Sequence, residues 1–437
     1  MLRVRINSGI NPVMSKISRF SYILIAVAVA VLFIAAAAPL APIYGGDSNW
    51  YIAIAEGHLN QVIQPFSGRV LHPFLAGWLS SFSSLNTTQS FLFLAIISLV
   101  FSLIVNSLIF KKTVRSPVFF VFLFFSPYFL SIFREFFLSD IFYVFLTSLF
   151  FLALFYEKEA LALLMLFPLF LARESTILLG AILLLVGLWR SKKLLSVAAA
   201  IVIILSVFTA SRFNSLGLPN AHELTGLPYL ILKLPYNFLN NVLGIVPWSN
   251  TLPHCEPIFQ YHLPALSFFG SIQSIGICGF NPLFPLATVT TLLTIFGIMP
   301  AVLIYLFSKR KIVFGKVPFW LAIALVYGVI SYFMSAIATT GVGRLAGYGW
   351  PAFLLFTPII FANSFKMEGE FLIKISFLQF FVAWLPFLIL KIGGETIFFY
   401  LFIIFFAAVA YWLTFRILKS REMTEGEIGP IMVSNGQ

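Results

Sequence analysis

The chain has 437 residues, of which 60 % are hydrophobic and only 10 % are charged, and its mean hydropathy is +1.01. A soluble fold cannot bury that much apolar side chain, and the chain repeats apolar runs of about 20 residues, the length that crosses a bilayer core. We therefore expect an all-α polytopic membrane protein with a single transmembrane domain over residues 1–437. The net charge of +12 does not indicate nucleic-acid binding, because the basic residues follow membrane topology.

The first apolar run sets the expected orientation. Four basic residues within the first 19 positions precede an apolar run over residues 22–42. The positive-inside rule then places the N-terminus in the cytoplasm and the following loop on the outer face. Residues 35–39 could also be a signal-peptidase site, but the run is longer than a typical signal, so we expect an uncleaved anchor.

About twelve transmembrane helices are expected, with both termini in the cytoplasm. Of the 27 Lys and Arg residues, 20 fall on the inferred cytoplasmic side or in the tails. The second to fifth helices are expected at about residues 90–110, 118–133, 140–156 and 160–172. The sixth is expected to end at residue 190, the seventh to cover 194–211, and the eighth to end before 309. The last four are expected at about 320–335, 350–366, 371–390 and 396–415.

The first outer loop, residues 44–85, combines a carboxylate with an anion-friendly helix start. A short amphipathic helix is predicted after Asp47, with apolar or aromatic residues and a histidine at helical spacing: Tyr51, Ile54, Ala55 and His58. A second short helix has Pro73 in its first turn, which places Arg69 and His72 at its N-terminal end, where backbone N–H groups favour an anion. Asp47 either caps a helix starting near Asn49 or acts as a catalytic carboxylate, and the two roles are compatible.

Seven basic residues do not fit the cytoplasmic bias: Arg69, Arg134, Arg173, Arg212, Lys233, Arg344 and Lys391. Charges in apolar surroundings tend to face a cavity with a partner. Ion pairs that pin helix ends are one explanation, with Glu135 and Asp140 near Arg134, and Glu174 beside Arg173. Arg344 has no acidic neighbour in sequence, which makes it the better candidate for a ligand phosphate.

The long outer loop, residues 212–282, is rich in Pro, Asn and aromatic residues, and we expect short helical stretches at most. Such residues suit either a sugar-binding face or, for most of them, a membrane-interface belt. Cys255 and Cys278 lie in this loop, where an outer compartment favours a disulfide between them over two buried thiols. The stretch His254-Cys255-Glu256 is only a weak metal signal.

No nucleotide-binding or hydrolase motif is present. The cytoplasmic segments are too short to form a nucleotide site, so the energy source is expected to be a lipid-soluble donor or an ion gradient.

The first loop resembles that of the GT-C superfamily of integral-membrane glycosyltransferases. The resemblance rests on Gly-Gly-Asp47-Ser-x-x-Tyr51-x-x-Ile54-Ala55-x-Gly57, which is similar to the loop of GPI-anchor second-mannose transferases, and on Arg69-x-Leu-x-Pro73, which is closer to bacterial members. Arg173-Glu174-Ser and Arg344 before Trp350-Pro351 add to it. Many relatives carry paired acids in this loop, whereas this chain has the single Asp47 with Glu56 two turns later. We therefore expect no cofactor and favour a metal-independent variant over one that uses a divalent metal.

The resemblance implies an inverting hexosyl- or pentosyltransferase of a bacterial inner or plasma membrane, active on the outer face. Such enzymes move a sugar from a polyprenyl-phosphate-linked donor to a lipid, glycan or protein acceptor, among membrane lipids and without nucleic acid. Asp47 would be the general base. The donor phosphate would be bound by Arg344, Arg69, Arg173 and His72, and the acceptor or sugar by Tyr51, Glu56, Glu174 and Trp350.

Two other functions compete with this one. An O-antigen-type polymerase or ligase would have a similar helix count and large outer loop, but it would rely on loop arginines rather than Asp47. A flippase or transporter would place ionisable residues in the middle of helices and repeat one half of the chain in the other. Here the charges cluster at helix ends and we detect no repeat, which argues against transport.

Overall fold

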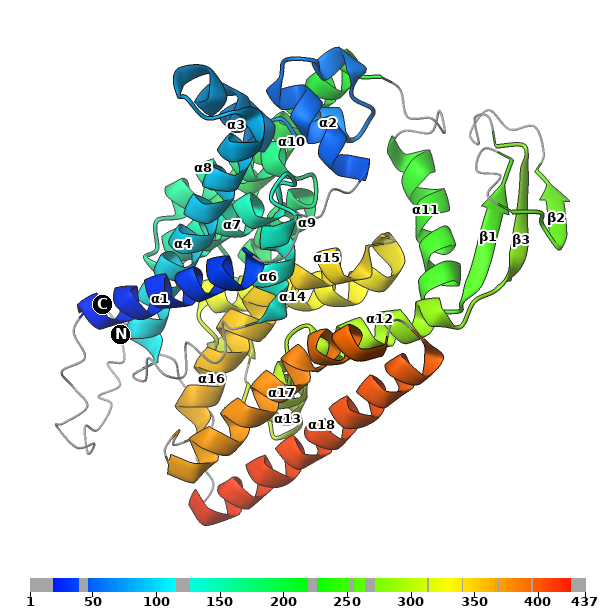
Figure 1. The fold of residues 1–437 in the computed structure, drawn as a ribbon. Helices are drawn as coiled ribbons and strands as arrows, with labels where there is room; N and C mark the ends of the chain where they lie inside the picture. Colours follow the sequence, from blue (N-terminus) through cyan, green and yellow to red (C-terminus); the bar gives the residue numbers. More distant parts are fainter. Residues whose placement is uncertain are drawn as a thin grey trace.

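The computed structural model describes residues 19–38, 46–114, 126–218, 226–250, 255–263, 272–312, 314–339, 341–365, 367, 369–393 and 396–425. Six of the described helices are long and apolar enough to cross a membrane: α4 (Thr87–Thr113), α10 (Lys193–Leu216), α14 (Phe319–Ala338), the stretch Val342–Ser364, α17 (Gly369–Gly393) and α18 (Ile397–Glu425). A pair bent by 70°, α12 (Leu283–Thr294) and α13 (Met299–Ser308), forms a seventh candidate. The chain is thus a mostly helical membrane protein (Figure 1).

The predicted twelve spans are not confirmed, because several of the expected helices are short. The helices α7 (Asp140–Phe155), α8 (Glu159–Ala172) and α9 (Thr176–Trp189) have 16, 14 and 14 residues. A helix of 14 residues is about 21 Å long, against about 30 Å for the bilayer core. Hydropathy alone predicted spans here because it does not distinguish side chains facing lipid from those packed against other helices, as nearly all of α7 is.

The first helix, α1 (Arg19–Ala37), lies close to its predicted position. The third predicted helix falls partly on residues 115–125, which lie outside the described residues. Its described part, α6 (Pro127–Arg134), begins at Pro127 and is capped by the Ser126 hydroxyl, which accepts a hydrogen bond from the Tyr128 backbone N–H at 3.3 Å. Proline therefore starts this helix rather than interrupting it, as its fixed backbone angle and missing N–H allow.

The helical body is built around α4 and α7. In it α4 packs along α7 and α1, while α10 packs along α8 and α9 (Figure 1). The buried Asn106 amide on α4 donates a hydrogen bond to the Ser148 hydroxyl on α7 at 2.8 Å. A polar contact between apolar helices fixes their register at modest energy.

The first outer loop contains the two predicted short helices, α2 (Gly46–Ala55) and α3 (Leu71–Phe82). A Cβ atom added at Gly77 of α3 would lie 2.2 Å from the Ala55 carbonyl oxygen of α2, so the glycine permits their close packing. Asp47 lies inside the first turn of α2, so it does not cap a helix starting near Asn49. A carboxylate in a first helical turn is still favoured by the helix dipole.

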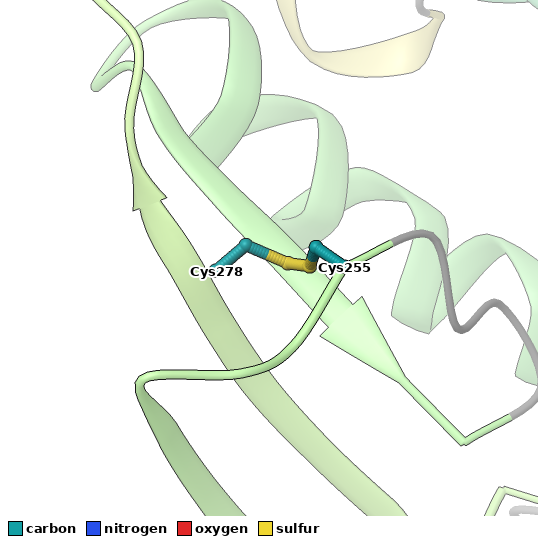
Figure 2. The surroundings of a disulfide bond; sticks show 2 residues. All are labelled: Cys255 and Cys278. Carbon is teal, nitrogen blue, oxygen red and sulfur yellow. A yellow bond between two sulfur atoms is a disulfide. The ribbon is translucent and has the colours of Figure 1, made fainter.

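The long outer loop is more ordered than predicted, and it adds a small sheet to a chain that is otherwise mostly helical. It contains α11 (Gly226–Asn241) and an antiparallel sheet of β1 (Ile245–Ser249), β3 (Ser274–Phe280) and β2 (Phe259–His262), in that order. In Figure 1 the sheet projects beside α11, away from the helical body. A disulfide between Cys255 and Cys278 ties the segment before β2 to β3 (Figure 2).

Candidate functional site

A polar cavity of about 430 Å³ lies where the first outer loop, the α8–α9 turn, α11 and α15 (Val342–Gly347) meet. Five of the residues singled out in the sequence line it: Asp47, Arg69, Arg173, Glu174 and Arg344. They come from three separate parts of the chain, the first outer loop, the α8–α9 turn and α15, so the fold gathers charges that are far apart in sequence. Lys233 of α11 lines the same cavity.

Arg69 and Glu174 form a bidentate ion pair on one wall. The Arg69 Nε and Nη2 atoms donate to the two Glu174 carboxylate oxygens at 2.7 and 2.5 Å, and Nη1 donates to the Tyr51 hydroxyl at 3.2 Å. Burial alone would raise the pKa of Glu174, but the charge and hydrogen bonds of Arg69 outweigh it and lower the pKa to about 2. Both groups therefore stay charged near neutral pH, and the planar fork of Arg69 is held in one orientation.

A second arginine, Arg173, pairs with the buried Asp140 at the start of α7. Its Nη1 atom donates to Asp140 Oδ1 at 2.7 Å, and the Tyr348 hydroxyl donates to the same oxygen. Asp140 is fully buried. From the sequence, Asp140 was expected only to be a neighbour of Arg134, although an acidic residue at the start of a strongly apolar helix is itself a signal of function.

Arg344 lies among three carboxylates. Its Nε atom is 3.3 Å from Asp140 Oδ2, its Nη2 atom 3.5 Å from Asp47 Oδ2, and its Nη1 atom 4.0 Å from Glu135 Oε2. The partly exposed Asp47 carboxylate and the Arg344 guanidinium thus face each other at the cavity. These three carboxylates could not be predicted from the residues next to Arg344 in sequence, because all of them come from distant segments.

The ion pairs also differ from those suggested by sequence proximity. Arg173 and Glu174 are adjacent, yet Arg173 pairs with Asp140 and Glu174 pairs with Arg69. The backbone at Arg173 is extended between α8 and α9, which directs successive side chains to opposite sides.

His72 does not line the cavity. Its ring lies between Phe91 and Phe142, with centroids 5.1 and 5.4 Å away, and is fully buried. Among the described residues neither ring nitrogen has a hydrogen-bond partner. Burial lowers the pKa of His72 to about 3, despite the opposing charge of Asp140. A neutral, enclosed imidazole is not placed to bind a donor phosphate.

Of the residues predicted to contact acceptor or sugar, only Glu174 lines the cavity. Tyr51 is buried behind the wall and supports Arg69. Glu56 is exposed beyond the end of α2. Trp350 is 1 % exposed and packs edge-on against Phe151 at 6.1 Å, so it belongs to the core.

Within the described ranges, no three His, Cys, Asp or Glu side chains come together as a metal site requires. His254, part of the weak metal signal, lies outside those ranges. The acids at and behind the cavity instead face arginine side chains. The cavity is lined by the guanidinium groups of Arg69, Arg173 and Arg344 and by Lys233.

Comparisons of the chain with protein-family models, with curated proteins and with solved structures return no match.

Proposed function

We propose that the chain is an inverting glycosyltransferase that moves a sugar from a polyprenyl-phosphate-linked donor to an acceptor at the non-cytoplasmic membrane face. The observation that supports this most is the cavity that brings the Asp47 carboxylate within 3.5 Å of the Arg344 guanidinium, with Arg69 and Arg173 on the same walls. Sugar transfer from a lipid phosphate needs such a combination: a base for the acceptor and fixed cations for the leaving group.

In the proposed reaction the acceptor hydroxyl attacks the anomeric carbon as its proton passes to a carboxylate oxygen of Asp47. The bond from the anomeric carbon to the phosphate oxygen breaks, and polyprenyl phosphate leaves with the electron pair. Attack from the side opposite the leaving group inverts the anomeric configuration, through an oxocarbenium-like transition state. Asp47 suits the role of base because it is partly exposed to the cavity, unlike Asp140.

The cations Arg344 and Arg173 would stabilise the negative charge that grows on the departing phosphate. Each is already oriented by a carboxylate, so little reorganisation is needed when the donor binds. Arginine binds phosphate through its planar set of donors, which provides charge stabilisation without a metal ion. We therefore propose that the reaction needs no divalent cation.

The proposal places the cavity on the outer face of a bacterial plasma membrane, in a chain that crosses it twelve times with cytoplasmic termini. The loops predicted to be cytoplasmic meet one another away from the cavity, which supports this sidedness. The Arg190 guanidinium donates to the backbone carbonyls of Phe314, Gly315 and Val317, and Lys192 pairs with Glu159. None of these residues lines the cavity.

Purified protein in detergent tests the proposal when supplied with a panel of polyprenyl-phosphate sugars and cell-envelope lipid extract as acceptor source. We expect transfer from at least one donor, unaffected by a chelator. Arg344→Ala should lower transfer by about 10²-fold or more, as for removal of a charge-stabilising donor.

The matched control is Arg212→Ala, because Arg212 is another outer arginine but is exposed and lies off the cavity. It should retain wild-type transfer. Wild-type protein that transfers sugar from no carrier would refute the proposal and favour the transport and polymerase alternatives. Transfer abolished by the chelator would refute its metal-independent form.

A further inference from the structure

We infer that Asp140 is a positioning residue that holds both Arg173 and Arg344 in place for the phosphate of a lipid-linked ligand. The inference rests on the proposed function and extends it to a residue behind the cavity wall. Asp140 is fully buried and does not itself line the cavity, so it would act through the two arginines rather than on the substrate.

The two oxygens of Asp140 are divided between the two arginines. Oδ1 accepts hydrogen bonds from Arg173 Nη1 at 2.7 Å and from the Tyr348 hydroxyl, while Oδ2 lies 3.3 Å from Arg344 Nε. One carboxylate thus joins α7 to the α8–α9 turn and to α15. The Tyr348 ring also lies 5.3 Å from the Arg173 guanidinium, which restricts that side chain further.

This arrangement determines which edge of Arg344 faces a ligand. The Nε edge forms an ion pair with Asp140 Oδ2 at 3.3 Å, Nη2 donates a hydrogen bond to Asp47 Oδ2 at 3.5 Å, and Nη1 lies 4.0 Å from Glu135 Oε2. A phosphate entering beside Asp47 would therefore meet the terminal nitrogens, while the side chain stays anchored at Nε. A guanidinium held in this way loses less conformational freedom when it binds an anion than a free one does.

A carboxylate in this position also lowers the repulsion between two neighbouring cations. Arg173 and Arg344 both face Asp140, and both line the cavity. Without the negative charge between them, the two guanidinium groups would repel each other and move apart. The phosphate would then lose the geometry of two cations presented together.

The test measures binding of undecaprenyl phosphate, a probe that carries no sugar, to the full-length protein in detergent micelles. Four proteins form a double-mutant cycle: wild type, Asp140→Asn, Arg344→Ala and the double variant. We expect Asp140→Asn to weaken binding about tenfold in the wild-type background and about threefold when Arg344 is already absent, because only the hold on Arg173 is then left to lose. Arg212→Ala serves as the unaffected control.

A merely structural role for Asp140 would weaken binding equally in both backgrounds, and that result would overturn the inference. Unchanged affinity in Asp140→Asn would also overturn it, as would a wild type that does not bind the probe. Binding that follows the cycle in a protein that transfers no sugar would instead refute the proposed transferase function alone.

If Asp140→Asn does not fold, the variant Asp140→Asn/Arg173→Gln keeps the number of positive and negative charges balanced. It still removes the partner of Arg344 Nε, so it is expected to bind more weakly than Arg173→Gln by about threefold. Equal affinity of these two variants would overturn the inference.

Discussion

The ion pair between Arg69 and Glu174 offers the most quantitative test of how the cavity wall is held. Replacing Glu174 with Gln keeps the shape of the side chain and removes its charge. The Arg69 guanidinium, whose side chain is only 9 % exposed, would keep at most one of its two hydrogen bonds, to the remaining amide oxygen, and would be left without its charged partner. Stability should fall because a charge left in a poorly solvated place is costly.

The magnitude follows from the pKa of Glu174 and its exposure. A pKa lowered from its usual 4.5 to about 2 corresponds to about 3.4 kcal/mol, at about 1.36 kcal/mol per pKa unit. Because the Glu174 side chain is 48 % exposed toward the cavity, solvent screens the pair, and we expect about 1–2 kcal/mol instead. The lowered pKa means that this stabilisation is complete above about pH 4.5 and is lost as the pH falls toward 2.

The assay is reversible unfolding in mixed micelles of dodecylmaltoside and SDS. At pH 7 the free energy of unfolding of Glu174→Gln should lie about 1–2 kcal/mol below that of the wild type, and the gap should close in acid. Glu370→Gln is the control, because Glu370 pairs with Lys374 on an exposed helix face and should cause no measurable change. Equal stabilities of Glu174→Gln and wild type at pH 7 would refute the reasoning.

Two further predictions concern the first outer loop. Gly77→Val should lower both stability and transfer, because its side chain would start 2.2 Å from the Ala55 carbonyl oxygen and separate α3 from the helix that bears Asp47; unchanged unfolding and transfer would contradict this packing. For His72, the pKa of about 3 means that protonation favours the unfolded chain, so wild-type stability should decline from pH 7 to 5. The free energy of unfolding of the His72→Phe variant should decline less over that range in the same assay. An equal decline in the variant and the wild type would refute the burial of His72.

Much of the helical layout could be predicted, because most of the predicted helices are apolar runs with charged residues at their ends. Hydropathy did not predict the lengths of the helices or their burial, so the 14 to 16 residues of α7 to α9 were not foreseen. The sheet was missed because its strands are short and interrupted, with Pro247 in β1 and two glycines in β3. The alternation of Ile275 and Ile277 in β3 was the signal that could have identified it.

The candidate site was partly predictable for a different reason. Charged residues next to apolar helix ends are few, which made them easy to single out in the sequence. Most of the charged residues predicted to form the site do line the cavity. Their pairing was not predictable, because Asp140 and Arg344 are 204 positions apart and only the tertiary fold brings them together. His72 shows the converse, since its place near a helix start suggested an anion site, whereas packing against Phe91 and Phe142 encloses it.

The most direct test of the central claim is the turnover of Asp47→Asn, measured beside its affinity for undecaprenyl phosphate. Turnover should fall by about 10²-fold or more, as for loss of a general base. Affinity should stay the same or rise, because the negative charge 3.5 Å from Arg344 is removed. Glu256→Gln, an exposed outer acid off the cavity, should match the wild type in both measurements. Normal turnover by Asp47→Asn would show that Asp47 is not the base and only stabilises the first turn of α2.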